Sequence, residues 1–416
     1  MKLLSEYRGL KRENYVLFFG RVVTSLGAMV WPMLTMILNQ KLGMDASAVA
    51  VFSVVTGAFY LPANLIGGKL ADRCDKRKII VVCDLISVAF YVGCAFLPMN
   101  AVTIGVVAAA GVFQSVEGPA YTALIADLNP IADRGRAYSL GYLGANLGMV
   151  LSPTIAGFLF RDYLWLAFVI SGVSIGISTA LIFFFVRDVV PCEEETEEAS
   201  YQKGREGLSF FRVLRENRTV LLYLFVMAFY FAAYSQYGYL MPLDLGRIHG
   251  EDGALLYGSV ASVNCITVVL FTPLITRLFL RLAGPKKTVS GILLLLVGYL
   301  VFLLGLGAIP FYYLAMLLFT WGEIFTTIAD GPYLTSRVPA THRGRIIGLG
   351  SVVTMLFEGA ARLLLGRLYD RAGHVAAWIA VFSLLTVSLF LGLILIRRDR
   401  KTYPKLYETR RETEKE

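Results

Sequence analysis

Charged residues are scarce in this sequence. They account for 17% of its 416 residues, whereas hydrophobic residues account for 56%. Because soluble domains carry roughly 25% charged and about 45–50% apolar residues, this composition excludes an ordinary soluble protein. The stretches 292–306 and 375–396 carry no charge at all, and a membrane-crossing helix needs about 20 predominantly apolar residues. The sequence therefore predicts an integral, multi-pass protein of the lipid bilayer.

Residues that build metal and catalytic sites are also few. The five cysteines are scattered without a CxxC spacing, and the three histidines lie in predicted loops with no nucleophile nearby. This pattern excludes a zinc site and a disulfide framework, and the lack of a Walker P-loop excludes nucleotide hydrolysis. We therefore expect no metal, no cofactor and no enzymatic activity.

Apolar segments of membrane-spanning length recur along the chain. A window of about 19 residues finds six before a polar stretch and six after it, and no period-2 pattern indicates a β-barrel. The segments lie near 15–38, 47–70, 78–98, 101–126, 137–160, 163–186, 219–242, 254–280, 287–306, 309–333, 346–369 and 374–396. We predict an all-α membrane protein of twelve transmembrane helices in two six-helix bundles. The predicted parts are a first bundle, a cytoplasmic linker, a second bundle and a cytoplasmic tail, at 1–187, 188–217, 218–396 and 397–416.

Lysine and arginine are distributed asymmetrically between alternate loops. If the N-terminus is inside, the outer loops hold few basic residues, namely Lys41, Arg161, Arg247, Arg367 and Arg371. The positive-inside rule then places both termini in the cytoplasm. Topology thus accounts for the net charge of +9, so we expect no nucleic-acid partner. The expected location is a bacterial-type cytoplasmic (inner) membrane, and we expect a monomer.

The two halves of the sequence repeat one another. A shift of 209 residues superimposes Arg-Gly-Arg at 134–136 on Arg-Gly-Arg at 343–345, and it places Glu323 on Gln114. Two parallel six-span repeats are a transporter architecture, in which the substrate site lies at the repeat interface near mid-membrane. We therefore expect Glu323 and Gln114 to face each other across that cavity.

The segment between the second and third predicted spans, 68–78, reads GKLADRCDKRK. It resembles the signature loop of the major facilitator superfamily, G-x-L-a-D-r-x-G-r-k. With the twelve spans and the repeat, this resemblance covers nearly the whole chain and implies a secondary transporter. The sequence departs from the pattern at Asp75, which replaces the second glycine. Because Asp tolerates positive φ, we expect the usual turn to be retained.

The resemblance also implies a conformational latch. Gly68 permits close helix approach, and Asp72 can cap a helix and pair with a basic residue in one conformation only. In the resembled family, equivalent acids link this loop to the outward-open state, and Asp127 and Arg136 are candidate partners here. The alternative is that the basic residues of the loop only set the topology. The predicted gating residues are Gly68, Asp72, Arg73, Arg77, Asp127 and Arg136.

The fifth span, 137–160, carries glycines three or four residues apart on one face, which allows close packing, and Pro153 allows a bend. It is similar to the glycine-proline motif of exporters in this superfamily, although Ser152 replaces a glycine. The resemblance favours export.

Ionisable residues inside the spans mark ion or substrate pathways, because leaving one in lipid costs at least several kcal/mol. Glu323 is the main candidate proton site, since a carboxyl in an apolar wall can be protonated in one state and ionised in another. The pair Gly322–Glu323 resembles that of proton-coupled multidrug exporters, in which the acid binds cationic drug and proton competitively. Glu117 is the candidate second titrating carboxylate. Alternatively, Glu323 forms a permanent hydrogen bond to a neighbouring helix.

The other candidate cavity residues are polar or aromatic, and their rings suit cations by stacking and cation–π contact, although Tyr and Trp also populate the membrane interface. They are Gln114, Tyr121, Tyr230, Tyr234, Tyr237, Trp321, Thr327, Asp330, Glu358 and Arg362. Glu358 and Arg362 are one helical turn apart, which favours a neutralising pair, and Arg21 can snorkel. Resembled exporters often have an arginine at the position of Gln114, so we expect a different proton route.

These features predict a proton-coupled antiporter that exports lipophilic, cationic small molecules by alternating access and is driven by the proton gradient. Two alternatives keep the same fold. One is a proton symporter or facilitator for a sugar, organic acid or other metabolite, with Arg21 and Arg362 as anion anchors. The other is a lipid translocase.

Overall fold

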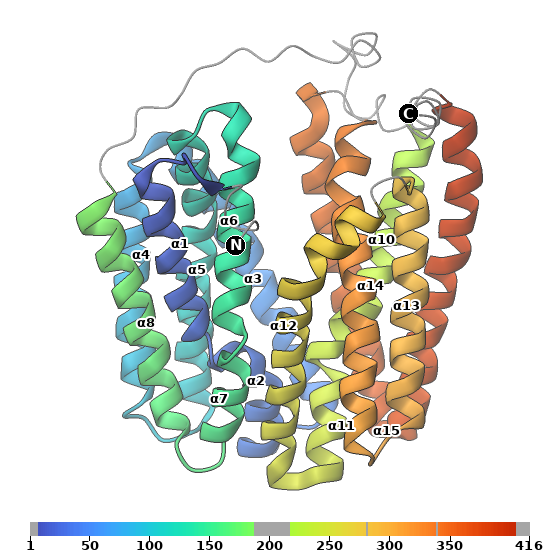
Figure 1. The fold of residues 1–416 in the computed structure, drawn as a ribbon. Helices are drawn as coiled ribbons and strands as arrows, with labels where there is room; N and C mark the ends of the chain where they lie inside the picture. Colours follow the sequence, from blue (N-terminus) through green and yellow to red (C-terminus); the bar gives the residue numbers. More distant parts are fainter. Residues whose placement is uncertain (1–6, 187–216, 280–281, 338–339, 405–416) are drawn as a thin grey trace. The chain divides into compact units, whose positions relative to one another are not determined.

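The computed structural model describes residues 7–186, 217–279, 282–337 and 340–404 (Figure 1). Contacts within the chain define two compact units. The first is Met1–Glu195 with Pro242–Val269, and the second is Thr196–Met241 with Leu270–Glu416. All regular elements among the described residues are helices, which confirms the predicted fold class.

The first half of the sequence forms eight helices. They are α1 (Arg12–Leu26), α2 (Val30–Met36), α3 (Ala46–Arg73), α4 (Lys76–Cys94), α5 (Ala101–Leu128), α6 (Ile131–Met149), α7 (Ser152–Leu159) and α8 (Leu164–Phe185). A π-helical turn, Ile37–Lys41, extends α2. The break between α6 and α7 directly precedes Pro153, as the predicted bend in the fifth span requires.

The second half forms six further helices. They are α10 (Arg218–Tyr234), α11 (Leu240–His249), α12 (Gly253–Leu278), α13 (Gly284–Leu304), α14 (Ile309–Thr335) and α15 (Ala340–Thr402). Short 3₁₀ segments, Ser235–Gly238 and Gly250–Asp252, flank α11. Gly373, with φ of 80°, divides α15 into two helices, because glycine adopts positive φ without a steric penalty.

Side-chain caps explain where several helices begin. The Asp45 carboxylate accepts a hydrogen bond of 2.7 Å from the Ala48 amide at the start of α3. Asn100 caps α5 by accepting from the amides of Val102 and Thr103. Such side-chain acceptors satisfy backbone N–H groups that have no partner within the helix.

Nine segments among the described residues are long and apolar enough to cross a membrane. Two of them, Arg218–Leu278 and Ile346–Thr402, contain 61 and 57 residues, which is far more than the about 20 that one crossing uses. The helix α4 is not among the nine because it carries three basic residues and Asp84. The prediction of twelve spans is consistent with this arrangement.

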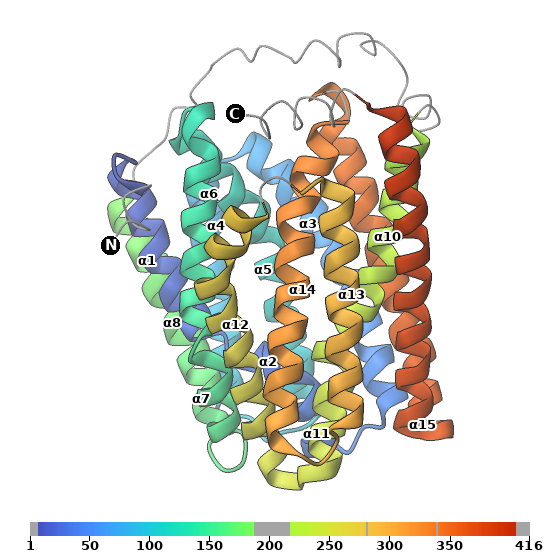
Figure 2. The ribbon, with the colours of Figure 1, turned by 45° about the vertical axis from the view of Figure 1, so that its right-hand side comes forward.

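Within each unit the helices pack in pairs. In the first unit α1 lies against α6 and α8, and α5 lies against α3 and α4. In the second unit α13 packs beside α14 and α10 beside α15, as Figures 1 and 2 both show. Aromatic rings fill part of the second core, where Trp378 lies 4.9 Å from Tyr299 and 5.2 Å from Phe302 between ring centroids.

Candidate functional site

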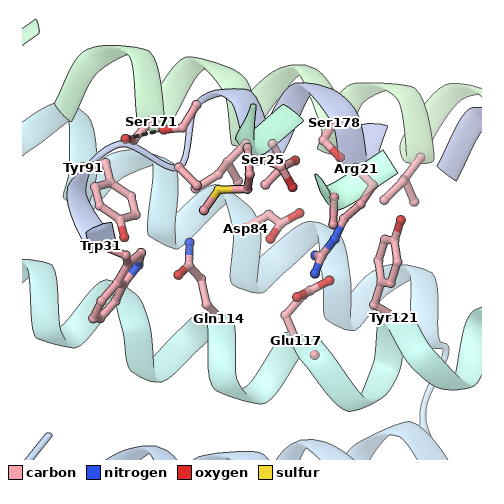
Figure 3. Close-up of a pocket in the computed structure, with 18 residues that line it drawn as sticks. Arg21, Ser25, Trp31, Asp84, Tyr91, Gln114, Glu117, Tyr121, Ser171 and Ser178 are labelled. Atoms are coloured by element: carbon pink, nitrogen blue, oxygen red, sulfur yellow. Dashed lines mark hydrogen bonds between the residues drawn. The ribbon is translucent and has the colours of Figure 1, made fainter. Parts of the chain in front are cut away.

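A cavity of about 460 Å³ lies inside the first unit, between α1, α4, α5, α6 and α8 (Figure 3). Three charged side chains line it, Arg21 from α1, Asp84 from α4 and Glu117 from α5. Serine hydroxyls, the Gln114 amide and three aromatic rings contribute the rest of its polar wall. Ionisable groups at this depth in a helical bundle mark a functional site.

Arg21 and Glu117 point toward one another across this cavity (Figure 3). The Arg21 guanidinium carbon lies 5.8 Å from the centroid of the Tyr121 ring, and the Tyr121 hydroxyl donates to the Leu17 carbonyl at 3.1 Å. Arg21, Glu117 and Tyr121 also line a second cavity, of about 620 Å³. The guanidinium of Arg21 therefore faces Glu117, whereas the sequence suggested that it snorkels.

Asp84 is the site residue that the sequence analysis missed. Its Oδ2 accepts a hydrogen bond of 2.7 Å from the Thr179 hydroxyl of α8, and the residue is buried. The signal was present, because Asp84 is the one acidic residue in the apolar run 79–98. Its helix begins with three consecutive basic residues, which are typical of a cytoplasmic loop and give no sign of a buried acid further along.

Gln114 lines the same cavity, three residues before Glu117 on α5. Figure 3 shows its amide between the Trp31 and Tyr91 rings at one end of the cavity and the charged groups at the other. Two of the predicted cavity residues, Gln114 and Tyr121, thus lie together with Glu117. Glu323 lies in the second unit, so the expected juxtaposition with Gln114 stays a prediction.

Glu323 lies on α14 in an aromatic environment. The Tyr234 hydroxyl donates to Glu323 Oε1 at 3.0 Å. The Tyr234 ring is stacked on Phe319 at 5.1 Å and on Tyr230 at 5.9 Å between centroids. Thr326 in turn donates to the Tyr230 hydroxyl at 2.9 Å. The C-terminal end of α10 and the middle of α14 thereby place rings and hydroxyls near this carboxyl group.

The other residues predicted for the second unit are spread over three helices. Asp330 accepts a 2.8 Å hydrogen bond from Tyr223. The Tyr237 ring packs 5.2 Å from Phe319. On α14, Trp321 is half-buried and Thr327 is exposed. On α15, Glu358 and Arg362 are both half-buried and lie one helical turn apart.

The predicted gating segment joins α3 to α4. Lys76 Nζ lies 2.7 Å from Asp127 Oδ2 at the end of α5, so Asp127 pairs with a basic residue of this loop. Arg77 contacts the Phe183 carbonyl, and its guanidinium carbon lies 5.1 Å above the Phe183 ring. Arg73 is exposed. The side chain of Asp72 lies outside the described residues.

Two expectations for the gating segment are corrected. Gly67, rather than Gly68, makes the close approach, because a Cβ on Gly67 would meet the Val116 backbone of α5, whereas no described atom lies within 4 Å of one on Gly68. Asp75 has φ of −61° and caps α4 by accepting from the Arg77 amide at 2.9 Å, so no left-handed turn is retained. Arg136 bonds Asp133 and the Arg8 carbonyl, and its predicted pairing with Asp72 stays a prediction.

Known proteins with similar sequences are transporters. The Na(+), Li(+), K(+)/H(+) antiporter of Planococcus maritimus is 25% identical, over 78% of this chain and 81% of that protein. Multidrug resistance protein MdtH of Yersinia pestis (strain Pestoides F) is 24% identical, over 71% of each chain. A solved POT family transporter in complex with a thioalcohol conjugated peptide superposes with a TM-score of 0.77 at 16% identity, over 94% of this chain and 96% of that one.

The family model of the Major Facilitator Superfamily matches residues 17–357. This range contains the gating segment, the charged cavity of the first unit and the carboxyl of Glu323. The chain belongs to the Major Facilitator Superfamily and is a membrane transporter of that family.

Proposed function

We propose that this transporter is a proton-driven antiporter that exports lipophilic, cationic small molecules by alternating access. The observation that carries the proposal is the Glu323 carboxyl, hydrogen-bonded to Tyr234 among stacked aromatic rings. A positive charge stabilises a carboxylate in such surroundings, because rings and other apolar groups solvate an ion less well than water does. A proton or an organic cation can supply that charge, and each excludes the other.

The aromatic rings account for the type of cation. A lipophilic cation gains attraction from the faces of the rings, about 2 kcal/mol or more for each desolvated cation–π contact, and it buries apolar surface as well. The half-buried Tyr234 lies beside Glu323, with the buried rings of Tyr230 and Phe319 stacked on it. The similarity to a Na(+), Li(+), K(+)/H(+) antiporter supports exchange of a cation for protons, and the similarity to a multidrug resistance protein supports export of drug-like molecules.

The proton gradient is the proposed energy source, and no cofactor is required. The proposal places the chain as a monomer in the cytoplasmic membrane of a bacterium with both termini inside, as the distribution of basic residues indicates. Export then uses protons that enter the cell down their gradient.

The test is substrate accumulation by purified protein in proteoliposomes with an imposed pH gradient. Vesicles that are acidic inside should accumulate a lipophilic cation as protons leave, and Glu323→Gln should remove this accumulation. Asp162→Asn, which changes an exposed acid, is the matched control and should transport normally. Accumulation of sugars or organic anions, or movement of lysolipids, in place of cations would reject the proposal and indicate one of the alternative transporter classes.

A further inference from the structure

The charges in the cavity of the first unit do not balance. Arg21 supplies one positive charge, while Asp84 and Glu117 supply two negative charges when both are ionised. Glu117 makes no hydrogen bond or ion pair with any described residue, although its side chain points into the cavity (Figure 3). Thr179 is the hydrogen-bond partner of Asp84 in the described part of the chain. Most of the carboxylate oxygens are therefore available to a ligand.

The net charge of the cavity, one negative charge, determines which ligand charge it binds best. An uncompensated carboxylate inside a membrane protein costs several kcal/mol, so the cavity is most stable when one further positive charge enters it. A single monovalent cation or one proton makes the cavity neutral. A divalent cation would leave an excess positive charge beside Arg21, which the same penalty disfavours.

The lining atoms indicate which cations fit. Carboxylates, the hydroxyls of Ser25 and Ser178 and the amide of Gln114 offer oxygen ligands, and no histidine or cysteine lines the cavity. Oxygen ligands of this kind suit hard cations, whereas transition metals favour nitrogen and sulfur. A volume of about 460 Å³ also holds several waters at about 30 Å³ each. A partly hydrated alkali cation therefore fits.

A second cavity shares part of the wall of this one. Arg21, Glu117 and Tyr121 line both this cavity and the neighbouring one of about 620 Å³, so a cation that moved from one cavity to the other would meet the Glu117 carboxyl.

The other titratable groups on the wall of the first cavity are the phenols of Tyr91 and Tyr121, while α6 and α8 contribute only uncharged side chains. Proton binding is therefore assigned to the two carboxyl groups.

We propose that this cavity binds one alkali cation, Na⁺ or Li⁺, between Asp84 and Glu117 in competition with a proton. The two carboxylates carry two negative charges, of which the cation neutralises one and Arg21 the other. Arg21 thereby restricts the site to monovalent ions. The site lies in the first unit and is separate from Glu323 in the second unit, so it does not require the exporter proposed above.

Proton release measures this competition directly. Purified protein in lipid nanodiscs, held in weakly buffered solution with a pH indicator, receives NaCl or LiCl, with choline chloride at the same ionic strength as the reference. We expect Na⁺ and Li⁺ to release up to one proton per protein, and choline to release none. Asp84→Asn and Glu117→Gln should lose at least nine-tenths of this release. Glu251→Gln, a change at an exposed acid, should retain it, and Glu323→Gln is measured in parallel to distinguish this site from the one in the second unit.

Arg21→Gln provides an independent variant in case neutral substitutions of the acids prevent folding. Removing the positive charge should tighten Na⁺ binding by about tenfold or more and should allow Ca²⁺ to release protons as well. Equal release by choline and Na⁺, full release from both acid variants, or unchanged ion preference in Arg21→Gln would each overturn the proposal. Loss of release in Glu323→Gln, with normal release in both acid variants, would place the competing site in the second unit.

Discussion

At the residue scale, the function proposed here depends on how single ionisable groups are surrounded. Glu323 accepts a hydrogen bond from the Tyr234 hydroxyl, and the Tyr234 ring is stacked on Phe319. A hydrogen bond to a charged group contributes about 1.5–3 kcal/mol, which is enough to change the balance between a bound proton and a bound cation. Tyr234 is therefore a positioning residue for the carboxyl.

Tyr234→Phe tests this role, because it keeps the stacked ring and removes the hydroxyl. We expect the apparent affinity for the cation to change by about tenfold and the pH profile of transport to shift, while maximal exchange persists. Tyr230→Phe is the matched control, since its hydroxyl bonds Thr326 instead of Glu323. Transport assays at several pH values measure both variants, and equal profiles for the two would contradict the role of Tyr234.

The sequence predicted part of these residue environments. Glu117, Gln114 and Tyr121 share one face of α5, so helical spacing was enough to group them. The contacts from other helices, Tyr234 to Glu323 and Thr179 to Asp84, depend on which helices pack together and at which register. Spacing along one chain does not determine that register, so these partners could not be predicted.

At the scale of helices, glycine positions determine which helices approach closely. A Cβ on Gly148 of α6 would lie 2.7 Å from the Leu26 backbone nitrogen of α1, whereas one on Gly141 of the same helix would meet no described atom within 4 Å. Of these two glycines in the segment predicted to pack closely, Gly148 lies at the contact between α6 and α1, and Gly141 does not.

Gly148→Ala should lower the stability of the protein in detergent by about 1–3 kcal/mol, because overpacking forces the two backbones apart. Gly141→Ala should leave stability unchanged or raise it slightly, since alanine favours helix. Thermal unfolding followed by size-exclusion chromatography compares the two. A similar loss of stability in both variants would indicate that the helix, and not its contact with α1, is sensitive.

A buried ion pair holds the ends of α14 and α15 together. Arg337 donates to both carboxylate oxygens of Asp399, at 2.7 and 2.6 Å, and Tyr333 donates to Asp399 at 3.0 Å. The two side chains of the ion pair are 6% and 0% exposed. Breaking such a pair by removing one partner leaves a buried charge and costs about 3–5 kcal/mol.

Asp399→Leu should therefore lower thermal stability strongly, and the double variant Arg337→Met with Asp399→Leu should recover much of the loss. The exposed pair of Arg161 and Glu251 provides the comparison, where Glu251→Ala should cost at most about 1 kcal/mol. Thermal unfolding of the four proteins in detergent measures the differences. A double variant no more stable than Asp399→Leu would show that packing, and not charge, dominates there.

At the scale of the whole molecule, the repeat read from the sequence also appears in the helices. The helix α6 begins at Ile131 and α15 at Ala340, which is 209 residues later, and α4 begins at Lys76 and α13 at Gly284, 208 residues later. The apolar segments predicted the fold because hydrophobic length determines membrane spans. The site chemistry, however, differs between the repeats, with Gln114 in one and Glu323 in the other.

We propose that Glu323 carries the proton that is exchanged for a cation. The most direct measurement is proton movement across proteoliposomes that carry a pH gradient, when a lipophilic cation is added to wild type and to Glu323→Gln. We expect the cation to trigger proton efflux in wild type, Glu323→Gln to abolish this efflux, and Asp162→Asn to behave as wild type. Cation-triggered proton movement of normal size in folded Glu323→Gln would contradict the claim.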